Sequence, residues 1–262
     1  MKAGTITVLG SGTSMGVPTI GCDCGVCRSA DPRDRRLRPS VMLEWGGHRI
    51  LIDSGPDFRE QAIRERIDRL DAVLFTHGHA DHILGLDDLR PLTFPRVTGG
   101  ARVPLYAAAD TADILRSVFK YIFDDNYKYG GIARVALNEI DGPFELFDLR
   151  IVPVPVLHGE ATIFGYRIGR FAYLTDFSEI PAESMAMLDG VSVVFLDALR
   201  QEPHPTHSTL DNSIQVAARI GAAQTFFTHM SHNVPHEATS QALPPGVMLA
   251  YDGLRVEADL ES

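Results

Sequence analysis

The chain has 262 residues, a hydrophobic content of 45%, a formal net charge of −10 and an isoelectric point near 5.4. This hydrophobic content is enough for a large core, whereas the acidic charge argues against sequence-independent nucleic-acid binding, which needs a basic surface. The first residues lack the apolar run of a signal peptide, and no segment reads as a membrane span. We therefore expect a cytoplasmic protein that binds neither membranes nor nucleic acid.

The N-terminal region begins with a predicted strand over residues 5–9, followed by a glycine-rich loop over residues 10–16. No Lys-Ser/Thr pair opens a helix after this loop, so it is not a Walker phosphate-binding loop. Two interpretations stay open, a tight turn and a wall of an active site.

Three cysteines, Cys22, Cys24 and Cys27, lie within six residues and make a disulfide framework improbable. Three thiolates at this spacing suit one tetrahedral zinc ion that lacks a fourth ligand, and the alternative is three reduced, unbound thiols. We predict a structural zinc site that stabilises a loop near residues 21–38, with the fourth ligand, a histidine in the simplest case, supplied from elsewhere.

The next segment combines a basic cluster with a predicted hairpin. The cluster comprises Arg33, Arg35, Arg36 and Arg38. We interpret it as a solvated loop rather than a site for a phosphate backbone. Residues 40–45 and 48–53 then flank a Gly-Gly turn, which predicts two antiparallel strands. Asp53 ends the second strand, where a carboxylate either caps a helix or orients a ligand histidine.

The central stretch, residues 76–82, reads Thr-His-Gly-His-Ala-Asp-His. An apolar strand is predicted before it at 72–75 and the start of an amphipathic helix after it at 83–86, so its side chains can converge at a strand-to-helix junction. Histidine and aspartate suit zinc, manganese or iron. Because four such residues exceed what one ion takes from so short a segment, we predict two ions. A polar loop that is rich in histidine by chance is the weaker alternative.

Helices are predicted over residues 55–70 and 111–119, with a strand at 103–107 between them. Residues 120–131 are aromatic and polar without clear periodicity. We interpret this stretch as packing beneath a loop, with a lid or a homodimer contact as the alternatives.

Four apolar segments in the second half each end in a residue that can bind metal: His158, Asp176, Asp197 and His229. Strands of one sheet direct such residues to one edge. Together with residues 77–82, these endings predict one convergent metal site. No linker interrupts the pattern, so residues 1–262 are expected to form a single domain.

Two further histidines are candidates for this site. His207 lies in a loop before a predicted helix at 210–220, where it caps, packs or donates a proton near the metals. His232 lies three residues after His229 and joins the same ions or completes the cysteine site.

The remaining C-terminal features add little to the predicted site. His204 and His236 have no supporting pattern and are expected at the surface. Residues 247–256 predict a hairpin with an Asp-Gly turn.

The His-x-His-x-Asp-His motif, with the later His158, Asp176 and His229, resembles the metallo-β-lactamase superfamily of metal-dependent hydrolases. The match covers nearly the whole chain. The resemblance implies a mixed α/β (α+β) fold, a four-layer αββα sandwich with two metal ions at one edge of the facing sheets. It also implies one ion held by His77, His79 and His158, a second held by Asp81, His82 and His229, and Asp176 as the bridge between them.

Within this superfamily, the chain resembles the cyclic phosphodiesterase group typified by the phosphoribosyl 1,2-cyclic phosphate phosphodiesterase of phosphonate breakdown. That group has a similar cysteine cluster, and the resemblance implies that His232 completes the structural zinc site. The group also has a loop histidine at the position of His207. Residues 236–239 spell His-Glu-Ala-Thr, a motif of the ribonuclease that matures tRNA 3′ ends, but here it follows His229 and we interpret it as coincidence.

We therefore predict an enzyme, a dinuclear metal-dependent hydrolase with two divalent ions (manganese or zinc) and one structural zinc. Its expected substrate is a small phosphodiester, attacked by a hydroxide that the two ions generate near neutral pH. Asp81 is expected to orient or deprotonate the nucleophile and His207 to protonate the leaving alkoxide. The preference for a ribose cyclic phosphate or a 2′,3′-cyclic nucleotide comes from the resemblance alone. The alternatives are a thioester or lactone hydrolase, a ribonuclease, and a non-catalytic metal-binding module.

Overall fold

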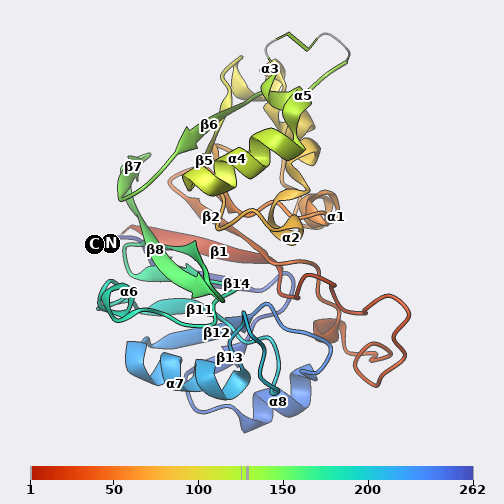
Figure 1. The fold of residues 1–262 in the computed structure, drawn as a ribbon, viewed down its shortest axis with the longest axis vertical. Coiled ribbons are helices and arrows are strands. Elements are labelled where there is room, and N and C mark those ends of the chain that lie inside the picture. The colour runs from red at the N-terminus through yellow and green to blue at the C-terminus, as the bar shows by residue number, and fades with distance from the viewer. Residues whose placement is uncertain (1, 125, 128–129, 262) are drawn as a thin grey trace.

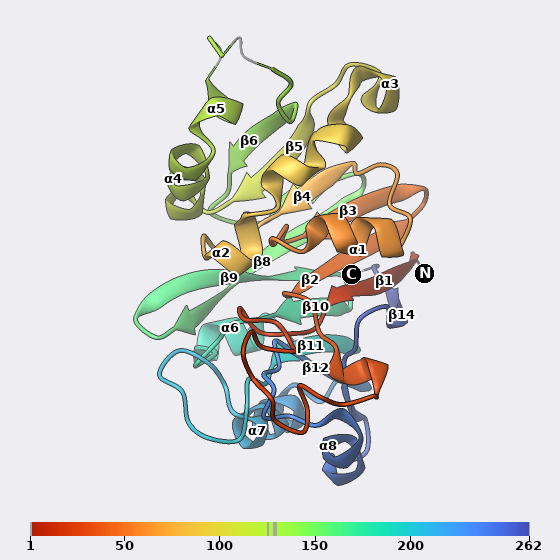
Figure 2. The same ribbon diagram turned by 90° about the vertical axis from the view of Figure 1, so that its right-hand side faces the viewer.

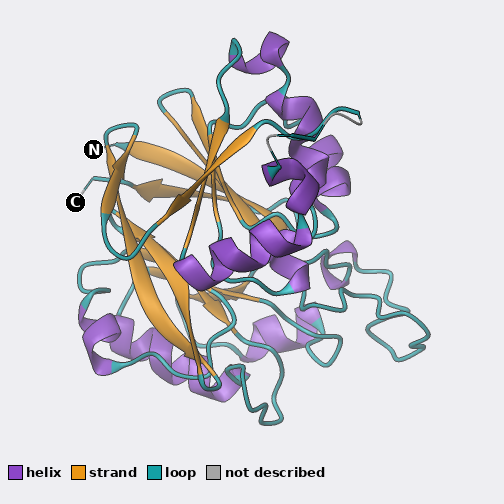
Figure 3. Ribbon diagram, turned by 45° about the horizontal axis from the view of Figure 1, so that its top comes forward, coloured by secondary structure: helices purple, strands orange, loops and turns teal. Residues whose placement is uncertain are grey.

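The computed structural model describes residues 2–124, 126–127 and 130–261. Two seven-stranded sheets face each other, and helices cover the outer face of each sheet (Figures 1 and 3). The predicted four-layer αββα sandwich is therefore confirmed. None of the helices in the described part of the chain is long and apolar enough to span a membrane.

The first sheet contains strands from both ends of the chain. Its order is β14 (Arg255–Asp259), β1 (Ala3–Gly10), β2 (Ser40–Trp45), β3 (His48–Ile52), β4 (Ala72–Leu74), β5 (Val103–Ala107) and β6 (Val135–Glu139). Because β1 pairs with β14, the two termini lie side by side (Figures 1 and 2). Its helical segments are α1 (Phe58–Arg64), α2 (Ala80–Ile83), a 3-10 helix (Leu86–Thr93), α3 (Pro95–Thr98), α4 (Ala109–Val118) and α5 (Lys120–Phe123).

The second sheet is built from the later part of the chain. Its order is β13 (Val247–Leu249), β12 (Gln224–Thr228), β11 (Val193–Asp197), β10 (Phe171–Leu174), β9 (Ala161–Ile168), β8 (Leu149–His158) and β7 (Phe144–Leu146). The helices of this half are α6 (Ala182–Ala186), α7 (Leu210–Ile220) and α8 (His236–Ala242). A short 3-10 helix, Pro32–Asp34, lies in the loop that follows β1.

The two-residue alternation of side chains explains why the sheets stack. In the predicted hairpin of β2 and β3, which is confirmed, Leu43 and Ile50 pair and face the second sheet. Their neighbours Met42 and Leu51 pair and face the helices. Since strands expose successive side chains to opposite faces, each sheet is buried on both sides.

The strand directions determine where functional side chains gather. Strands β3 to β6 run parallel in the first sheet, and β10 to β13 run parallel in the second. The carboxyl ends of β10, β11 and β12 therefore meet at one edge, where Asp176, Asp197 and His229 follow or end these strands. The histidine-rich stretch follows β4 in the facing sheet.

The predicted C-terminal hairpin is wrong. β13 pairs in parallel with β12 in the second sheet, whereas β14 pairs antiparallel with β1 in the first. The Asp-Gly segment between them crosses from one sheet to the other. The carboxylate of Asp252 accepts hydrogen bonds from the backbone N–H groups of Ser11 (2.9 Å) and Leu37 (2.8 Å), which holds this crossing in place.

The prediction that the arginine cluster is solvated is wrong for Arg36, whose exposed fraction is 1%. Its guanidinium donates to the carbonyl oxygens of Ser231 (3.0 Å) and Val234 (2.7 Å), and burial lowers its pKa to about 10. Arg36 thus ties the cysteine-bearing loop to the segment after β12. The free-energy cost of removing this cation from water is offset by the nearby carboxylate of Asp34 and by the two carbonyl dipoles.

The aromatic stretch after α4 is only partly described. Ile122 is buried in the core between the first sheet and its helices, and Tyr121 and Phe123 pack against that core, as expected for packing beneath a loop. Residues 125, 128 and 129 lie outside the described residues. The lid and the homodimer contact stay predictions.

Candidate metal centre

Seven predicted ligands come together at the edge of the two sheets. They belong to five short segments of the chain: His77 and His79 after β4, Asp81 and His82 in α2, His158 at the end of β8, Asp176 after β10, and His229 after β12. They form two groups in which the possible ligand atoms lie within 4.8 Å of one another. One group is His77, His79 and His158, and the other is Asp81, His82, Asp176 and His229.

Asp176 lies between the two groups. One of its oxygens is 3.3 Å from Nε2 of His82, and the other is 3.3 Å from Nε2 of His229. The second oxygen is also 3.9 Å from Nε2 of His77, which belongs to the first group. This position suits a carboxylate that bridges two ions.

Backbone conformation at the strand ends directs these side chains. Asp53, Asp176 and His229 have φ angles of 64°, 57° and 58°. This left-handed region is unusual for residues with a side chain and costs about 1–3 kcal/mol each where the surroundings enforce it. Such strain is concentrated at functional sites, and here it marks three strand ends that face one point.

Buried groups outside the cluster fix the orientation of its imidazoles. Asp53 accepts hydrogen bonds from Nδ1 of His82 and from the N–H and hydroxyl of Thr76, each at 2.8 Å. Of the two roles considered for Asp53, the structure shows the orienting one, because the cap position of α1 is Asp57. His158 likewise uses Nδ1 toward the carbonyl oxygens of Asp176 (2.6 Å) and Thr206 (2.9 Å). Both histidines thereby keep Nε2 for a ligand.

The electrostatics of the cluster fit bound cations. Asp53, Asp81, Asp176 and Asp197 are all buried. Burial opposes the charged form of Asp176, but His229 and His82 outweigh it and hold the pKa of this carboxyl well below its usual range. Burial also lowers the pKa of His77, which favours the neutral imidazole that metals bind. Despite burial, the carboxylates of Asp176 and Asp81 instead raise the pKa of His82, and they raise that of His229 to about 9, so an ion would have to displace protons from these two rings.

Three imidazole nitrogens of the cluster are buried without a hydrogen bond in the described part of the chain: Nε2 of His77, Nε2 of His82 and Nδ1 of His229. The Nε2 atoms of His77 and His82 face the carboxylate of Asp176, and Nδ1 of His229 faces Asp197. A buried polar atom without a partner costs about 1–3 kcal/mol unless something satisfies it. With several carboxylates around them, these atoms fit divalent ions well.

His207 is next to the cluster and is held by Asp197. Its Nδ1 lies 2.8 Å from a carboxylate oxygen of Asp197, and its ring stacks on His229 with 4.7 Å between centroids. From sequence, Asp197 was one of four strand endings expected at a convergent metal site, with no separate role beside His207. Its place at the carboxyl end of β11, on the same edge as the ligands, is the signal that could have assigned one.

The expectation that His204 and His236 are ordinary surface residues is wrong. His204 is half-buried, and its ring centroid is 5.0 Å from that of His207. His236 has an exposed fraction of 4%, and its backbone N–H donates to Asp34. Neither position is apparent from local sequence, because both depend on loops that return from elsewhere in the chain.

The cysteine cluster forms a second group of ligand-type residues. Nδ1 of His232 lies 3.2 Å from the sulfur of Cys22 and 3.5 Å from those of Cys24 and Cys27. Tetrahedral zinc with ordinary Zn–S and Zn–N bonds separates sulfur and nitrogen by about 3.6 Å. The N–H of Cys27 lowers the pKa of Cys24 to about 6, which favours its thiolate, whereas burial raises the pKa of Cys27 to about 11, so an ion would have to displace that proton. The four residues therefore fit the predicted zinc.

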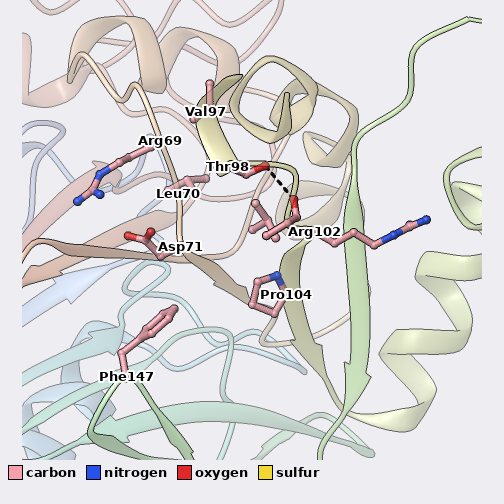
Figure 4. A pocket seen from close by; sticks show the side chains of 10 residues that line it. Arg69, Leu70, Asp71, Val97, Thr98, Arg102, Pro104 and Phe147 are labelled. Atoms are coloured by element: carbon pink, nitrogen blue, oxygen red, sulfur yellow. Dashed lines mark hydrogen bonds between the residues drawn. The ribbon is translucent and has the colours of Figure 1, made fainter. Parts of the chain in front are cut away.

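The glycine-rich loop contributes to the neighbourhood of the site, as one of its two interpretations required. Thr13, Ser14 and Met15 line a small cavity together with His207. A different cavity of about 320 Å³ is lined by Arg69, Arg102 and Phe147 among others (Figure 4). It lies where β4 and β5 begin, at the sheet edge opposite the ligands, and the described residues that line it include neither histidine nor cysteine.

Comparison with known proteins identifies the family. Residues 48–230 match the family model of the beta-lactamase superfamily domain, so the chain belongs to this superfamily and has the metallo-β-lactamase fold. A crystal structure of a diphosphatase from the PhnP family is 59% identical, covers 99% of each chain and superimposes with a TM-score of 0.94.

Two curated relatives are named for activities other than that of the diphosphatase. An octanoyltransferase of Porphyromonas gingivalis is 42% identical over 96% of this chain and 51% of its own length. The chain thus spans about half the length of that relative. A ribonuclease Z of Methanopyrus kandleri is 26% identical over 87% of this chain and 94% of its own length.

Proposed function

We propose that this hydrolase is a dinuclear metal-dependent phosphodiesterase that acts on small, in particular cyclic, phosphodiesters. The observation that carries the proposal is the pairing of a seven-residue His/Asp cluster with a histidine, His207, that Asp197 holds beside it. The 59% identity to a diphosphatase supports chemistry at phosphorus. We further propose that the chain holds three divalent ions, two of manganese or zinc at the sheet edge and one zinc at the cysteines.

Each side chain has a defined task in this proposal. His77, His79 and His158 would hold one ion, and the group of Asp81, His82 and His229 the other, with Asp176 between them. When bound, such ions polarise phosphoryl oxygens and lower the pKa of water toward neutral. Asp81 would orient or deprotonate the nucleophile. Its carboxylate lies 3.2 Å from His82 Nε2 and 3.5 Å from His229 Nε2, next to the atoms that would hold the second ion.

His207 supplies the proton for the leaving group. Asp197 accepts the hydrogen bond from Nδ1, so Nε2 is the nitrogen that exchanges a proton with substrate. Asp197 also stabilises the charged imidazolium before transfer. An alkoxide needs this proton, whereas a thiolate, whose conjugate thiol has a pKa of about 8.5, leaves more easily without it. The His207–Asp197 pair therefore favours an ester of oxygen over the thioester alternative.

The names of the two curated relatives lead to different activities. The octanoyltransferase is about twice as long as this chain, so its activity cannot be assigned to the matching half from the name. A ribonuclease must attract a polyanion, and the net charge of −10 opposes this. A small phosphodiester carries much less charge than a polyanion, so its electrostatic repulsion from the protein is smaller.

A parallel kinetic assay tests the proposal. Manganese-loaded protein of measured metal content would be given bis(p-nitrophenyl) phosphate, a 2′,3′-cyclic nucleotide, a ribose cyclic phosphate and a thioester. Preference for a cyclic phosphate, with about three metals per chain, is the expected result. Thioester turnover without phosphodiester turnover would refute the phosphodiesterase.

A further inference from the structure

The cavity of about 320 Å³ at the sheet edge opposite the ligands has no task in the proposed reaction (Figure 4). Both sheets contribute to its lining: Asp71 precedes β4 and Pro104 belongs to β5, whereas Phe147 lies in the turn between β7 and β8. Its volume is within the range of about 300–1,000 Å³ that is usual for small-molecule sites. The chemistry of its walls therefore indicates which ligand it would bind.

Phe147 supplies an aromatic surface at a position where the backbone disfavours a large side chain. It begins the two-residue turn between Leu146 and Leu149, and φ is 49° at Phe147 and 62° at Asp148. A turn with two positive φ angles favours Asn-Gly, so a phenylalanine there adds strain. The ring of His48 stacks on that of Phe147, with 4.4 Å between centroids and an angle of 11° between planes. The Phe147 ring is thus held in place, and Figure 4 shows it directed toward β4 and β5.

Asp71 supplies a hydrogen-bond acceptor to the same cavity. Its Oδ2 accepts from the backbone N–H of Arg49 at 2.8 Å. Its Oδ1 accepts no hydrogen bond from a described residue, and the carboxylate forms no ion pair with one, although Arg69 is only two positions away in the sequence. A half-buried carboxylate oxygen of this kind favours a ligand that brings an N–H or O–H donor.

Two guanidinium groups give the cavity positive charge. That of Arg69 donates to the carbonyl oxygen of Gly47, and that of Arg102 donates to the carbonyl oxygen of Val135 at 3.1 Å. Neither forms an ion pair with a described carboxylate. Figure 4 shows the two side chains at opposite ends of the cavity. An anionic group of a ligand at either end would therefore find a cation that no carboxylate neutralises.

We infer that this cavity is a second binding site, separate from the metal centre, and that its ligand is a nucleotide. The base stacks on Phe147 and donates an N–H hydrogen bond to Oδ1 of Asp71, while the phosphate lies toward one of the two arginines. Simpler ligands satisfy only part of the lining. An aromatic acid offers no donor to Asp71, and an aromatic cation is repelled by two arginines without counter-ions. Inorganic phosphate leaves the aromatic surface unused.

Trp45 makes binding at this site directly observable. It is the only tryptophan of the chain, and its ring centroid is 6.2 Å from that of Phe147. Adenosine, guanosine and cytidine, whose bases carry amino groups, would be titrated beside purine riboside, whose base has no N–H. We expect at least one of the three to change the fluorescence of Trp45 and to bind more tightly than purine riboside. Nucleosides are used first because they lack the phosphate through which a nucleotide would reach the metal centre.

The decisive variant is Asp71→Asn, which keeps an acceptor for the N–H of Arg49 and puts an amide donor in place of the free acceptor. Affinity for the amino-bearing nucleoside should fall roughly 10-fold or more, and its advantage over purine riboside should disappear. A site that attracted nucleotides through charge alone would behave in the opposite way, because removal of a carboxylate would strengthen their binding. Asp189→Asn, an equal change at an exposed position outside the cavity, is the control.

Phe147→Asn tests the aromatic surface and preserves the turn, because asparagine suits a positive φ. Nucleoside affinity, measured by calorimetry, should fall roughly 5–150-fold, whereas Phe147→Tyr should retain it. Arg69→Gln or Arg102→Gln should reduce the preference for the 5′-monophosphate over the nucleoside and leave nucleoside binding unchanged. Arg170→Gln, an equal charge change at the exposed turn between β9 and β10, should alter neither.

The result does not depend on the proposed phosphodiesterase, because a nucleoside contains no phosphodiester and the cavity contains none of the predicted metal ligands. Nucleoside binding that weakens in Asp71→Asn and in Phe147→Asn supports the second site even if no phosphodiester is hydrolysed. Absence of nucleoside binding to the wild type, or affinities that both variants leave unchanged, would overturn the inference. Hydrolysis of bis(p-nitrophenyl) phosphate would in that case still support the phosphodiesterase.

Discussion

The cysteine cluster and the histidine–aspartate cluster are held by different parts of the architecture. Three of the four residues of the cysteine cluster come from one loop without strands, and only His232 comes from elsewhere. The ligands of the histidine–aspartate cluster come from five segments in both halves of the sandwich. Buried groups such as Asp53 and the carbonyl of Asp176 orient them.

The two clusters therefore acquire their geometry in different ways. The carboxyl edges of two stacked sheets position the histidine–aspartate ligands, so that site is preorganised by the core. The cysteine loop has little core of its own and is attached to the segment after β12 by side chains of Arg33, Asp34 and Arg36. We therefore expect the loop, and not the sheet edge, to depend on its ion for order. The predictions below test this distinction.

The largest expected effect is on the rate of hydrolysis by the residues at the sheet edge. His207→Ala should slow hydrolysis of substrates with poor leaving groups by roughly 10²–10⁴-fold and spare activated aryl esters, because only an alkoxide requires the proton. Steady-state kinetics on bis(p-nitrophenyl) phosphate and an alkyl phosphodiester would measure this. An equal loss on both classes would count against the acid role of His207.

A smaller effect is expected from Asp53→Asn, which weakens the support of His82. Loss of an orienting carboxylate typically costs about 10–100-fold in metal affinity or activity. Metal titration and kcat/KM would be compared with Asp68→Asn, an exposed carboxylate that precedes β4, at the end of that strand opposite the ligands. Unchanged metal affinity in Asp53→Asn would show that the sheet edge does not need this support.

Cys24→Ser should remove one metal ion per chain and leave the active-site ions in place. Activity should stay within about tenfold, because the sheet edges and not the loop position the catalytic groups. The melting temperature should fall and cease to respond to mild chelation. Elemental analysis with a thermal melt measures both. Loss of all metals together would contradict the independence of the two clusters.

The smallest effect is a pH dependence beside the cysteine loop. Burial, followed by the charges of Arg33 and Arg36, lowers the pKa of His236 to about 4. In the unfolded chain His236 has an ordinary pKa of about 6.5, so it takes up a proton at a higher pH than in the folded chain. The free energy of unfolding therefore decreases as the pH falls from about 6.5 toward 4. Lowering the pH from 7.5 to 6 should cost about 1 kcal/mol through this group.

His236→Gln should remove that part of the pH dependence. Urea unfolding of both proteins at the two pH values gives the difference directly, and protonation of metal ligands cancels because both proteins share them. A variant that loses as much stability as the wild type would show that His236 does not carry the effect.

Local sequence was enough to predict several parts of the molecule. The hairpin of β2 and β3 follows from alternation around two glycines, and α7 occupies the predicted residues 210–220. All eleven residues predicted as metal ligands lie in the two clusters, although their role as ligands stays a prediction. Motif spacing and strand endings are local properties, so they can be recognised in the sequence without knowledge of the fold.

Other features depended on contacts between distant segments. Three examples are the burial of Arg36, the hydrogen bond between Asp197 and His207, and the cavity beside Arg200 and His204. Each involves segments that are distant in the sequence or a loop that folds back on itself. The assignment of β13 and β14 to different sheets is of the same kind, since an Asp-Gly pair suits a hairpin equally well.

Sequence patterns alone predicted which residues would gather as candidate metal ligands and that strand ends would present them. Their shared edge, and the carboxylates that orient them, became clear only from the tertiary structure. The physical reason is that side-chain periodicity is set within each strand, whereas the order of strands, and with it every long-range pairing, is set by packing two sheets on one core.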